Sequence, residues 1–234
     1  MKSEQMAHEA DMQQHRAQAF LFDMDGTLID SHILVERVWE AWCARCDLNL
    51  DDIRPYTHGV RTEDTVRMVA PHLDVATEVA WMEEIETDTT GGIAPVPGAD
   101  VFLQSMPAGR WAVVTSASRP VLDARFTACN MQLPAVIVTS EEVERGKPAP
   151  DPYLLAAKRL GVDPRQCIVF EDAPAGMASA LAAGCKVVLV GDFISDEPGV
   201  IGHITDFAQL DFSVDGDLLL SAPAPVLKGL RAIA

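Results

Sequence analysis

The stretch Ala19-Phe20-Leu21-Phe22-Asp23-Met24-Asp25-Gly26-Thr27 joins a run of four apolar residues to a turn that carries two carboxylates. Four consecutive apolar residues before such a turn predict a short, fully buried strand. Asp23 and Asp25 are two residues apart, so both side chains leave the chain on the same side and can share a cation or a proton. An Asp-Gly turn by itself does not need the second carboxylate. The stretch therefore predicts a buried strand that ends in a chemically active crevice.

Four more short apolar runs predict further buried strands. They are residues 111–114, 135–138, 167–170 and 186–190. Helical patterns separate most of these runs. The pattern at 152–160 stops at Gly161 and the pattern at 173–183 stops at Gly184, and glycine commonly ends helices. The alternation of strands and helices predicts an α/β fold with a doubly wound, Rossmann-like parallel sheet.

Polar side chains stand where several of these predicted strands end. Asp23, Thr115 and Asp172 each fall at or just beyond the end of an apolar run. In open α/β sheets, ligands bind in the crevice outside the carboxyl ends of the strands. We therefore expect these three side chains to contribute to a single site at one edge of the sheet.

Residues 32–98 show a different pattern, with apolar residues at helical spacing such as Val35, Val38, Trp39 and Trp42. This periodicity predicts helices in place of strands. The interpretation is an all-helical domain inserted after the first strand, because the strand pattern resumes only after this segment.

The predicted domain boundaries follow from these changes of pattern. The α/β core consists of residues 19–31 and 99–221, and the helical domain of residues 32–98. Residues 1–18 are expected to form a disordered tail because they are mostly polar. A last short strand is expected near residues 212–220, with a loosely held tail after it.

The composition is that of an ordinary folded protein, with 234 residues of which 48% are hydrophobic. The formal net charge is −17, from 35 acidic and 18 basic side chains. Such a balance argues against nucleic acid or an anionic membrane surface as a partner. No apolar run approaches the length of a membrane span, and the amino terminus lacks a signal-peptide pattern. We expect a cytoplasmic monomer.

The chain has five cysteines, and Cys43 and Cys46 form a lone C-x-x-C. This spacing occurs in redox and metal sites, but here no second pair and no nearby histidine accompanies it. The two cysteines continue a helical apolar pattern. They are interpreted as core residues of a helix in a protein of a reducing compartment.

Four clusters of residues, in order along the chain, resemble the signature motifs of the haloacid dehalogenase superfamily. The first motif is similar to Asp23-Met24-Asp25-Gly26-Thr27. Thr115 or Ser116 resembles the second motif, Lys147 the third, and the pair Glu171-Asp172 the fourth. Four ordered matches are far more specific than any one of them.

Most members of that superfamily are magnesium-dependent phosphohydrolases, and the resemblance implies the same chemistry here. Asp23 would attack phosphorus and form an aspartyl-phosphate. Asp25 would protonate the departing alkoxide and then accept a proton from water. Mg²⁺ would be bound by Asp23, the backbone carbonyl of Asp25 and Asp172, with Glu171 as a ligand or an outer contact.

The other two motifs imply contacts to the phosphoryl group. Lys147 would place a positive charge against Asp23 and a phosphoryl oxygen. Either Thr115 or Ser116 would donate a hydroxyl hydrogen bond. The sequence leaves open which of the two hydroxyls is the motif residue, because the loop can be aligned in two ways.

The segment 58–65 resembles the cap of small polyol and sugar phosphate phosphatases of the glycerol-3-phosphatase and hexitol phosphatase type. The resemblance implies a small phosphorylated sugar or polyol as substrate. His58 and Arg61 could hydrogen-bond substrate hydroxyls or add positive potential above the phosphate. The helical domain would then act as a cap over the active site.

Three glutamates of the predicted helical domain have two interpretations. Glu83, Glu84 and Glu86 could accept hydrogen bonds from a polyol. A solvated helix face is the more ordinary interpretation and is favoured by the sequence.

The main alternative is a sugar phosphomutase similar to β-phosphoglucomutase. That family has a cap sequence close to residues 59–64, but its arginine falls one position later, where Thr62 stands here, which counts against mutase activity. Asp25 argues against dehalogenation, because a halide departs without a proton donor. A non-enzymatic sugar phosphate sensor would not need Asp23, Asp25 and Lys147 together.

Overall fold

The computed structural model describes residues 12–224 and 226–227, and its centre is a parallel sheet of six strands in the order β6-β5-β2-β7-β8-β9. The strands are β2 (Ala19–Phe22), β5 (Trp111–Val114), β6 (Val136–Val138), β7 (Cys167–Glu171), β8 (Lys186–Val190) and β9 (Val200–Ile204). β2 lies between β5 and β7, and the chain builds outward from it in both directions. This is a doubly wound sheet, so the predicted α/β fold class is confirmed.

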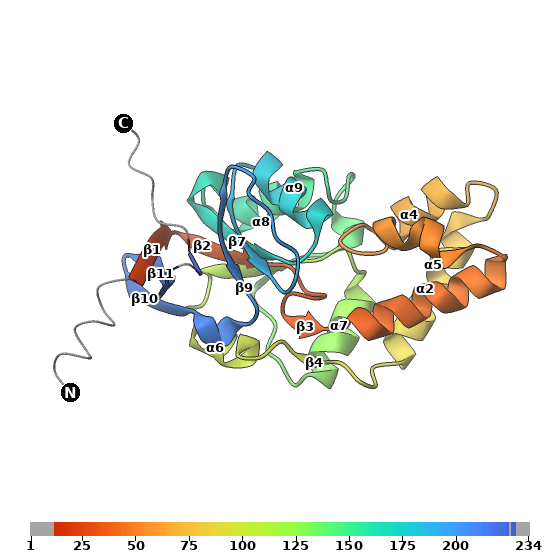
Figure 1. The fold of residues 1–234 in the computed structure, drawn as a ribbon, viewed down its shortest axis with the longest axis horizontal. Helices are drawn as coiled ribbons and strands as arrows, with labels where there is room; N and C mark the ends of the chain where they lie inside the picture. The colour runs from red at the N-terminus through yellow and green to blue at the C-terminus, as the bar shows by residue number, and fades with distance from the viewer. Residues whose placement is uncertain (1–11, 225, 228–234) are drawn as a thin grey trace.

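Helices cover both faces of this sheet (Figure 1). They are α6 (Ala99–Ser105), α7 (Arg119–Ala128), α8 (Asp151–Leu160) and α9 (Pro174–Ala182). Alternate residues of β2 point to opposite faces. Leu21 belongs to the apolar cluster that includes residues of α8 and α9, whereas Phe20 and Phe22 pack with Phe102 and Phe126 of α6 and α7. A strand of only four residues therefore contributes side chains to the apolar layers on both faces of the sheet.

A second, three-stranded antiparallel sheet lies at one end of the molecule (Figure 1). Its strands are β1 (Met12–Ala17), β10 (Asp211–Asp215) and β11 (Asp217–Pro223). The prediction of a disordered tail over residues 1–18 is wrong for residues 12–17, which pair with β11 along their whole length. Residues 1–11 of that prediction lie outside the described residues. The sequence of β1 is polar and does not predict a strand, because this strand is stabilised by its pairing with β11.

The strand expected near residues 212–220 is a hairpin of two strands, β10 and β11, with Gly216 at the turn. Gly216 has a φ of 67°, a conformation that glycine adopts without strain. Strand β9 was not predicted, because Gly202 and His203 interrupt its apolar residues. Short 3₁₀ turns complete this half of the chain. They are η2 (Ser140–Glu142), η3 (Pro164–Gln166) and η4 (Phe207–Gln209).

The segment between β3 (Ile29–Asp30) and β4 (Ala94–Pro95) is helical and lies to one side of the sheet (Figure 1). Its elements are α2 (His32–Cys46), α3 (Leu50–Ile53), η1 (Arg54–Tyr56), α4 (Thr62–Val69) and α5 (Val75–Asp88). These helices share an apolar cluster of their own, which includes Trp42, Val66 and Met82. β3 and β4 pair with each other and so form the connection to the sheet.

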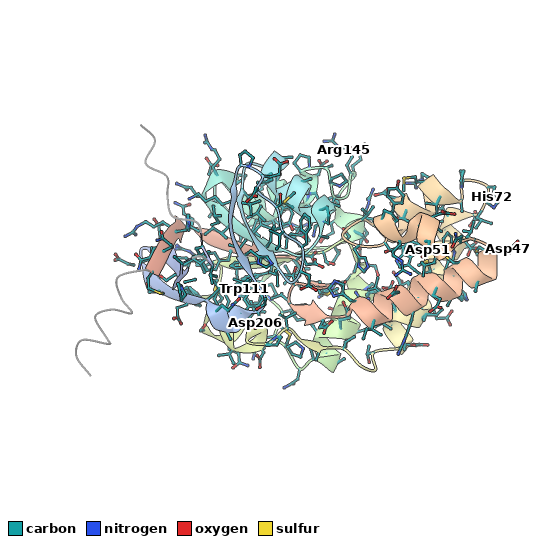
Figure 2. All side chains as sticks on the ribbon, viewed as in Figure 1. Asp47, Asp51, His72, Trp111, Arg145 and Asp206 are labelled. Atoms are coloured by element: carbon teal, nitrogen blue, oxygen red, sulfur yellow. The ribbon has the colours of Figure 1, made fainter. Side chains whose placement is uncertain are left out.

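Within this helical segment, the cysteines of the C-x-x-C lie in α2 as expected. Cys43 is buried in the cluster, and both Cys43 and Cys46 are free thiols. Asp47 and His72 lie at the end of the segment farthest from the sheet (Figure 2). The described helices include none that is long and apolar enough to cross a membrane.

Candidate active site

Two strand ends and the loop between β6 and α8 bring Asp23, Glu171 and Lys147 together. Asp23 follows β2, and its carboxylate accepts a hydrogen bond from Lys147 Nζ at 2.5 Å. The same ammonium donates to Glu171 Oε1 at 2.6 Å and to the carbonyl oxygen of Val114 at 3.1 Å. All three polar side chains are buried. Of the three residues expected to meet at the carboxyl edge of the sheet, Asp23 lies close to Asp172 and lines one cavity with Thr115. Lys147 has used all three of its donors.

Lys147 keeps its charge in this buried position. Burial lowers the pKa of its ammonium group, but the carboxylates of Asp23 and Glu171 raise that pKa by more, so the net shift is upward. A buried charge is tolerated only when it is paired and hydrogen-bonded. Lys147 therefore acts as a fixed positive charge beside Asp23.

Glu171 is held by four donors. Its Oε1 accepts from Lys147 and from the hydroxyl of Tyr153 at 2.8 Å. Its Oε2 accepts from the backbone N–H groups of Asp172 at 3.1 Å and Ala173 at 3.2 Å. A Cβ at position 176 would come within 1.6 Å of Glu171 Oε1, so only glycine fits there. This carboxylate positions Lys147 and the start of α9 through its existing bonds.

A cation fits between the carboxylates at the strand ends. Oxygen atoms of Asp23, Glu171 and Asp172 lie within 4.8 Å of one another. Burial raises the pKa of Asp23, and the neighbouring carboxylates raise it further, while Lys147 opposes them. Burial and the charge of Glu171 also raise the pKa of Asp172, against the hydrogen bond from His32. One ammonium does not balance three carboxylates, and hard divalent cations prefer such oxygen ligands.

Asp25 lies at the entrance to this centre and is bonded on both oxygens. Ser31 Oγ donates to its Oδ1 at 2.5 Å, and Arg125 donates to its Oδ2. The same guanidinium donates to Glu86 Oε1 at 2.7 Å. Arg125 thus connects the carboxylate after β2 to helix α5 of the helical segment.

The two candidate hydroxyls after β5 have different partners. Thr115 Oγ1 accepts from the backbone N–H of Ala117 at 3.0 Å, which leaves its hydroxyl hydrogen available. Ser116 Oγ donates to the carbonyl oxygen of Gly59 at 2.9 Å. The hydroxyl hydrogen of Ser116 is therefore used to hold the loop before α4, and the geometry favours Thr115 as the donor to a bound phosphoryl group.

Arg61 is placed differently from the expectation. Its guanidinium bonds the carboxylate of Asp64 at 2.6 and 3.0 Å and the carbonyl oxygens of Val143 and Glu144 at 3.1 and 3.2 Å. The side chain is 11% exposed and packs against the backbone of Gly146. Arg61 therefore links α4 to the loop that carries Lys147, and its donors are already used by the protein.

His58 lines the same cavity and lies 5.3 Å from His32, ring centroid to ring centroid. Burial lowers the pKa of His58, and the nearby His32 adds to this. His32 Nε2 lies 3.1 Å from Asp172 Oδ2, and this hydrogen bond raises the pKa of His32. His58 is the neutral member of this pair at neutral pH.

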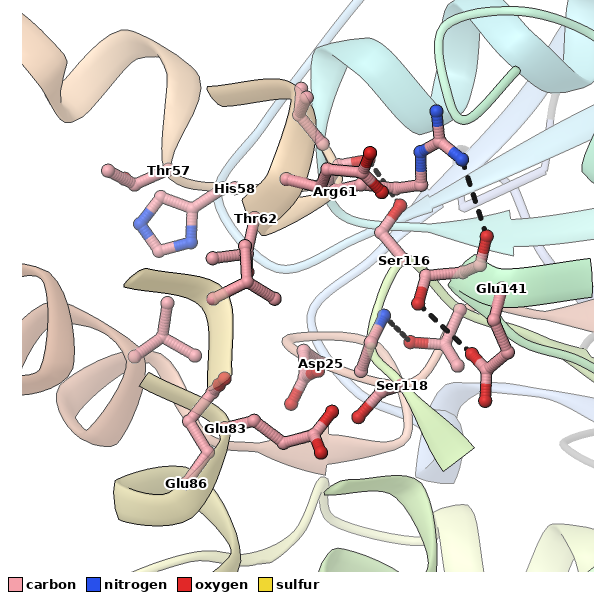
Figure 3. Close-up of a pocket in the computed structure, with 18 of the residues that line it drawn as sticks. Asp25, Thr57, His58, Arg61, Thr62, Glu83, Glu86, Ser116, Ser118 and Glu141 are labelled. Carbon is pink, nitrogen blue, oxygen red and sulfur yellow. Dashed lines mark hydrogen bonds between the residues drawn. The ribbon is translucent and has the colours of Figure 1, made fainter. Parts of the chain in front are cut away.

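A cavity of about 740 Å³ lies between the strand ends and the helical segment (Figure 3). Asp23, Asp25 and Thr115 line it on the side of the sheet. Glu83 and Glu86 of α5 extend into the same cavity (Figure 3). The favoured interpretation as a solvated face is wrong for Glu86, whose side chain is 15% exposed and is paired with Arg125. Glu83 is half-buried, and Glu84 is exposed as expected.

Sequence reasoning missed Arg125 and Tyr153. Each lies within the buried stripe of its helix, with Leu122 and Phe126 beside Arg125 and Ala156 and Ala157 beside Tyr153. A charged or hydroxylated residue at an apolar position of a helix is the signal that would have found them, because such a group needs a buried partner.

Comparison with known proteins agrees with this geometry. The chain is 45% identical over 180 residues to Hexitol phosphatase A of Escherichia coli (strain K12), which covers 75% of this chain and 83% of that protein. It is 34% identical over 185 residues to Glycerol-1-phosphate phosphohydrolase 2 of Saccharomyces cerevisiae (strain ATCC 204508 / S288c), with 74% of each chain covered.

Among solved structures, CbbY from Rhodobacter sphaeroides in complex with phosphate is similar, with a TM-score of 0.67 and 25% identity over 82% of this chain and 96% of that chain. The family model for haloacid dehalogenase-like hydrolases matches residues 20–190, which include all four motifs and the helical segment. The chain therefore belongs to the haloacid dehalogenase-like hydrolase family.

Proposed function

We propose that this protein is a magnesium-dependent phosphatase that hydrolyses phosphate monoesters of small sugars or polyols through an aspartyl-phosphate on Asp23. One observation carries the proposal. Asp23 lies 2.5 Å from a fully buried Lys147, and Asp25 follows two residues later. The names of the relatives support the substrate class, because they include a hexitol phosphatase and a glycerol-1-phosphate phosphohydrolase.

The first half of the reaction transfers the phosphoryl group to the protein. One oxygen of Asp23 accepts from Lys147, and the other is the nucleophile that forms a bond to phosphorus. The bond from phosphorus to the ester oxygen breaks at the same time. Asp25 gives its proton to the departing alkoxide, which leaves as an alcohol.

The second half returns the protein to its starting state. Asp25, now a carboxylate, takes a proton from a water molecule. The water oxygen bonds to phosphorus, the bond from phosphorus to Asp23 breaks, and inorganic phosphate leaves. Ser31 and Arg125 hold Asp25 by both oxygens between these two steps.

Asp23, Asp172 and the backbone carbonyl of Asp25 would hold the Mg²⁺ ion, which supplies positive charge between the nucleophile and the phosphate. Glu171 stands beside them, but its oxygens already accept four hydrogen bonds. We assign it the outer contact. Thr115 adds a hydrogen-bond donor for the phosphoryl oxygens, and Lys147 adds its fixed positive charge beside Asp23.

The helical segment is proposed to act as a cap domain, with residues 32–98 as its extent. It supplies one wall of the cavity through α5 and the loop before α4. A cap excludes water from the first step and selects the leaving group. The free cysteines of the described chain are compatible with a cytoplasmic location.

Phosphate release from a panel of hexose, hexitol and triose phosphates in the presence of Mg²⁺ tests this function. We expect release from a subset of the panel, and its loss in Asp23→Asn. Asp123→Asn is the matched control, because Asp123 is half exposed on α7 and, among the described residues, pairs with Arg119 alone. Normal release by Asp23→Asn contradicts the proposal. Interconversion of glucose 1-phosphate and glucose 6-phosphate without release would support the mutase instead.

A further inference from the structure

One buried guanidinium, that of Arg125, bonds a carboxylate from each side of the cavity, and a third carboxylate lines the same cavity. Arg125 is 1% exposed and bonds both Asp25 and Glu86. Glu83 lines the same cavity one helical turn earlier on α5, and its charge raises the pKa of Glu86 in addition to the larger effect of burial. Within the described chain, the Glu83 carboxylate has no hydrogen-bonded or ion-paired partner. The local charge is therefore negative even after Arg125 is counted.

The other basic side chains that line this cavity are also occupied. Arg61 bonds Asp64 and backbone carbonyls, and Arg67 pairs with Glu63 and Asp64. His58 has a lowered pKa because it is buried. Among the described residues that line the cavity, no unpaired cation remains on the cap side. A second anionic group of a substrate would find no countercharge there.

Two donors in the same wall have no partner. Arg125 Nε and Ser118 Oγ are buried atoms without a hydrogen bond in the described part of the chain, and both residues line the cavity. Figure 3 shows Ser118 beside Asp25 and facing the glutamates of α5. A buried donor without a partner costs free energy unless a ligand satisfies it. A ligand hydroxyl can accept from such donors and donate to a carboxylate in one contact.

We propose that Glu83 and Glu86, together with Arg125 and Ser118, form a hydroxyl-reading wall that admits an uncharged polyhydroxylated leaving group and excludes one that carries a second phosphate or a carboxylate. This inference rests on the proposed phosphatase function and makes its substrate class narrower. The phosphate to be cleaved is neutralised at the strand ends by Lys147 and the proposed cation. A second anion would have to lie against Glu83 in a partly desolvated cavity, where like charges repel strongly.

Matched substrate pairs that differ by one anionic group test this wall. Glycerol 3-phosphate and 3-phosphoglycerate differ by a hydroxymethyl against a carboxylate, and fructose 6-phosphate and fructose 1,6-bisphosphate differ by a second phosphate. The member with the uncharged leaving group is called the neutral member of each pair. We expect the wild-type kcat/KM to be about 100-fold higher for the neutral member than for the other. Glu83→Lys should narrow that ratio by about tenfold, mainly through faster hydrolysis of the charged member.

Glu84→Lys is the matched control, because Glu84 is the next residue of α5 and is exposed. It should leave the ratio within about twofold of wild type. A ratio in Glu83→Lys equal to that of Glu84→Lys, or a wild-type enzyme that hydrolyses both members equally well, overturns the inference while the phosphatase function stands.

A binding measurement separates this inference from the proposed function. Calorimetric titration of Asp23→Asn with each member of a pair measures affinity without turnover. We expect tighter binding of the neutral member even if the panel shows no phosphate release. Equal affinities for the two members overturn the inference whatever the outcome of the activity assay.

Discussion

Tyr153 contributes a hydroxyl to a pocket in which every other donor to Glu171 is charged or belongs to the backbone. It lies in α8, is fully buried, and its ring lies 5.2 Å from Lys147 Nζ. Burial and the charge of Glu171 raise its pKa, so it remains a hydrogen-bond donor. Because Tyr153 and Lys147 donate to the same oxygen of Glu171, we expect the position of Lys147 to depend on Tyr153.

Tyr153→Phe tests that dependence. Losing the hydrogen bond to a charged acceptor should lower the free energy of unfolding by about 2 kcal/mol, measured by urea denaturation. Tyr56→Phe is the control, because Tyr56 is 42% exposed, and it should change the free energy by less than about 0.5 kcal/mol. Equal effects of the two substitutions would show that the Glu171 contact adds no stability.

The charge state of His32 depends on its contact with Asp172. The hydrogen bond to Asp172 is the largest cause of its raised pKa, and the charges of Asp172 and Asp30 add to it, against burial. A raised folded-state pKa means that protonated His32 stabilises the fold. That contribution is complete below the unfolded pKa of about 6.5 and is lost as the pH rises through the folded value.

The loss of unfolding free energy in His32→Asn should therefore be larger near pH 5.5 than near pH 9. These two pH values lie about one unit or more from the unfolded imidazole pKa of about 6.5. A metal chelator in the buffer keeps cations away from Asp172. Urea denaturation of both proteins across this pH range measures the loss. His72→Asn, at an exposed histidine of the same segment, is the matched control for the loss of an imidazole. A pH-independent loss in His32→Asn would contradict the assignment.

Individual site residues were predictable where a strand ends. Asp23 and Asp172 follow apolar runs, so the sheet alone brings them together, and motif order identifies Lys147. The hydrogen-bond partners of the site residues were not predictable in the same way. The donors of Arg61 are taken up by carbonyls some eighty residues away along the chain, and no local pattern indicates such a contact.

At the scale of elements, Arg61 connects the start of α4 with the loop between β6 and α8. Its guanidinium donates hydrogen bonds to the carbonyl oxygens of Val143 and Glu144, in addition to its ion pair with Asp64. Ser116 makes the neighbouring connection, to the carbonyl oxygen of Gly59. Two loops of the sheet are thus tied to one loop of the helical segment.

Replacing this connection should affect both stability and turnover. Arg61→Met should lower the free energy of unfolding by about 2 kcal/mol, because the partly buried carbonyls of Val143 and Glu144 lose their donors. It should also lower kcat by about tenfold, because the loop before Lys147 is no longer held. Arg67→Met removes a half-exposed arginine of the same helix, and neither quantity should change much. Wild-type kcat in Arg61→Met would show that the loop is positioned without it.

The central strands were readable from sequence because strands buried on both faces are continuously apolar, as in β2, β5 and β7. β1 and β10 could not be read in this way. β1 is rich in polar residues, and most of β10 is exposed. Both exist through pairing with β11, and such long-range pairing leaves little trace in the local sequence.

The molecule as a whole carries a net charge of −17 and concentrates three carboxylates at its centre. Such a chain repels itself and attracts cations in general. Specific binding of Mg²⁺ is a separate effect that adds to this background. The two can be separated because general screening depends on ionic strength, whereas a site depends on the ion.

Mg²⁺ should raise the free energy of unfolding by about 2.7 kcal/mol at one hundred times its Kd, when compared with NaCl of equal ionic strength. Asp172→Asn should lose most of this gain, because it removes a proposed ligand. Asp123→Asn should keep it. A gain in NaCl equal to that in MgCl₂ would mean that the −17 charge is merely screened. The melting temperature of each protein in the two salts is the measurement.

The measurement that tests the central claim most directly is the trapping of the phosphorylated protein. Enzyme, Mg²⁺ and a hydrolysed sugar phosphate are mixed, quenched in acid within one turnover, and digested for tandem mass spectrometry. The account predicts one phosphoryl group on the peptide that contains Asp23, localised to that carboxylate and missing when Mg²⁺ is removed. Phosphate release without any phosphorylated peptide, or a phosphoryl group on another residue, would contradict it.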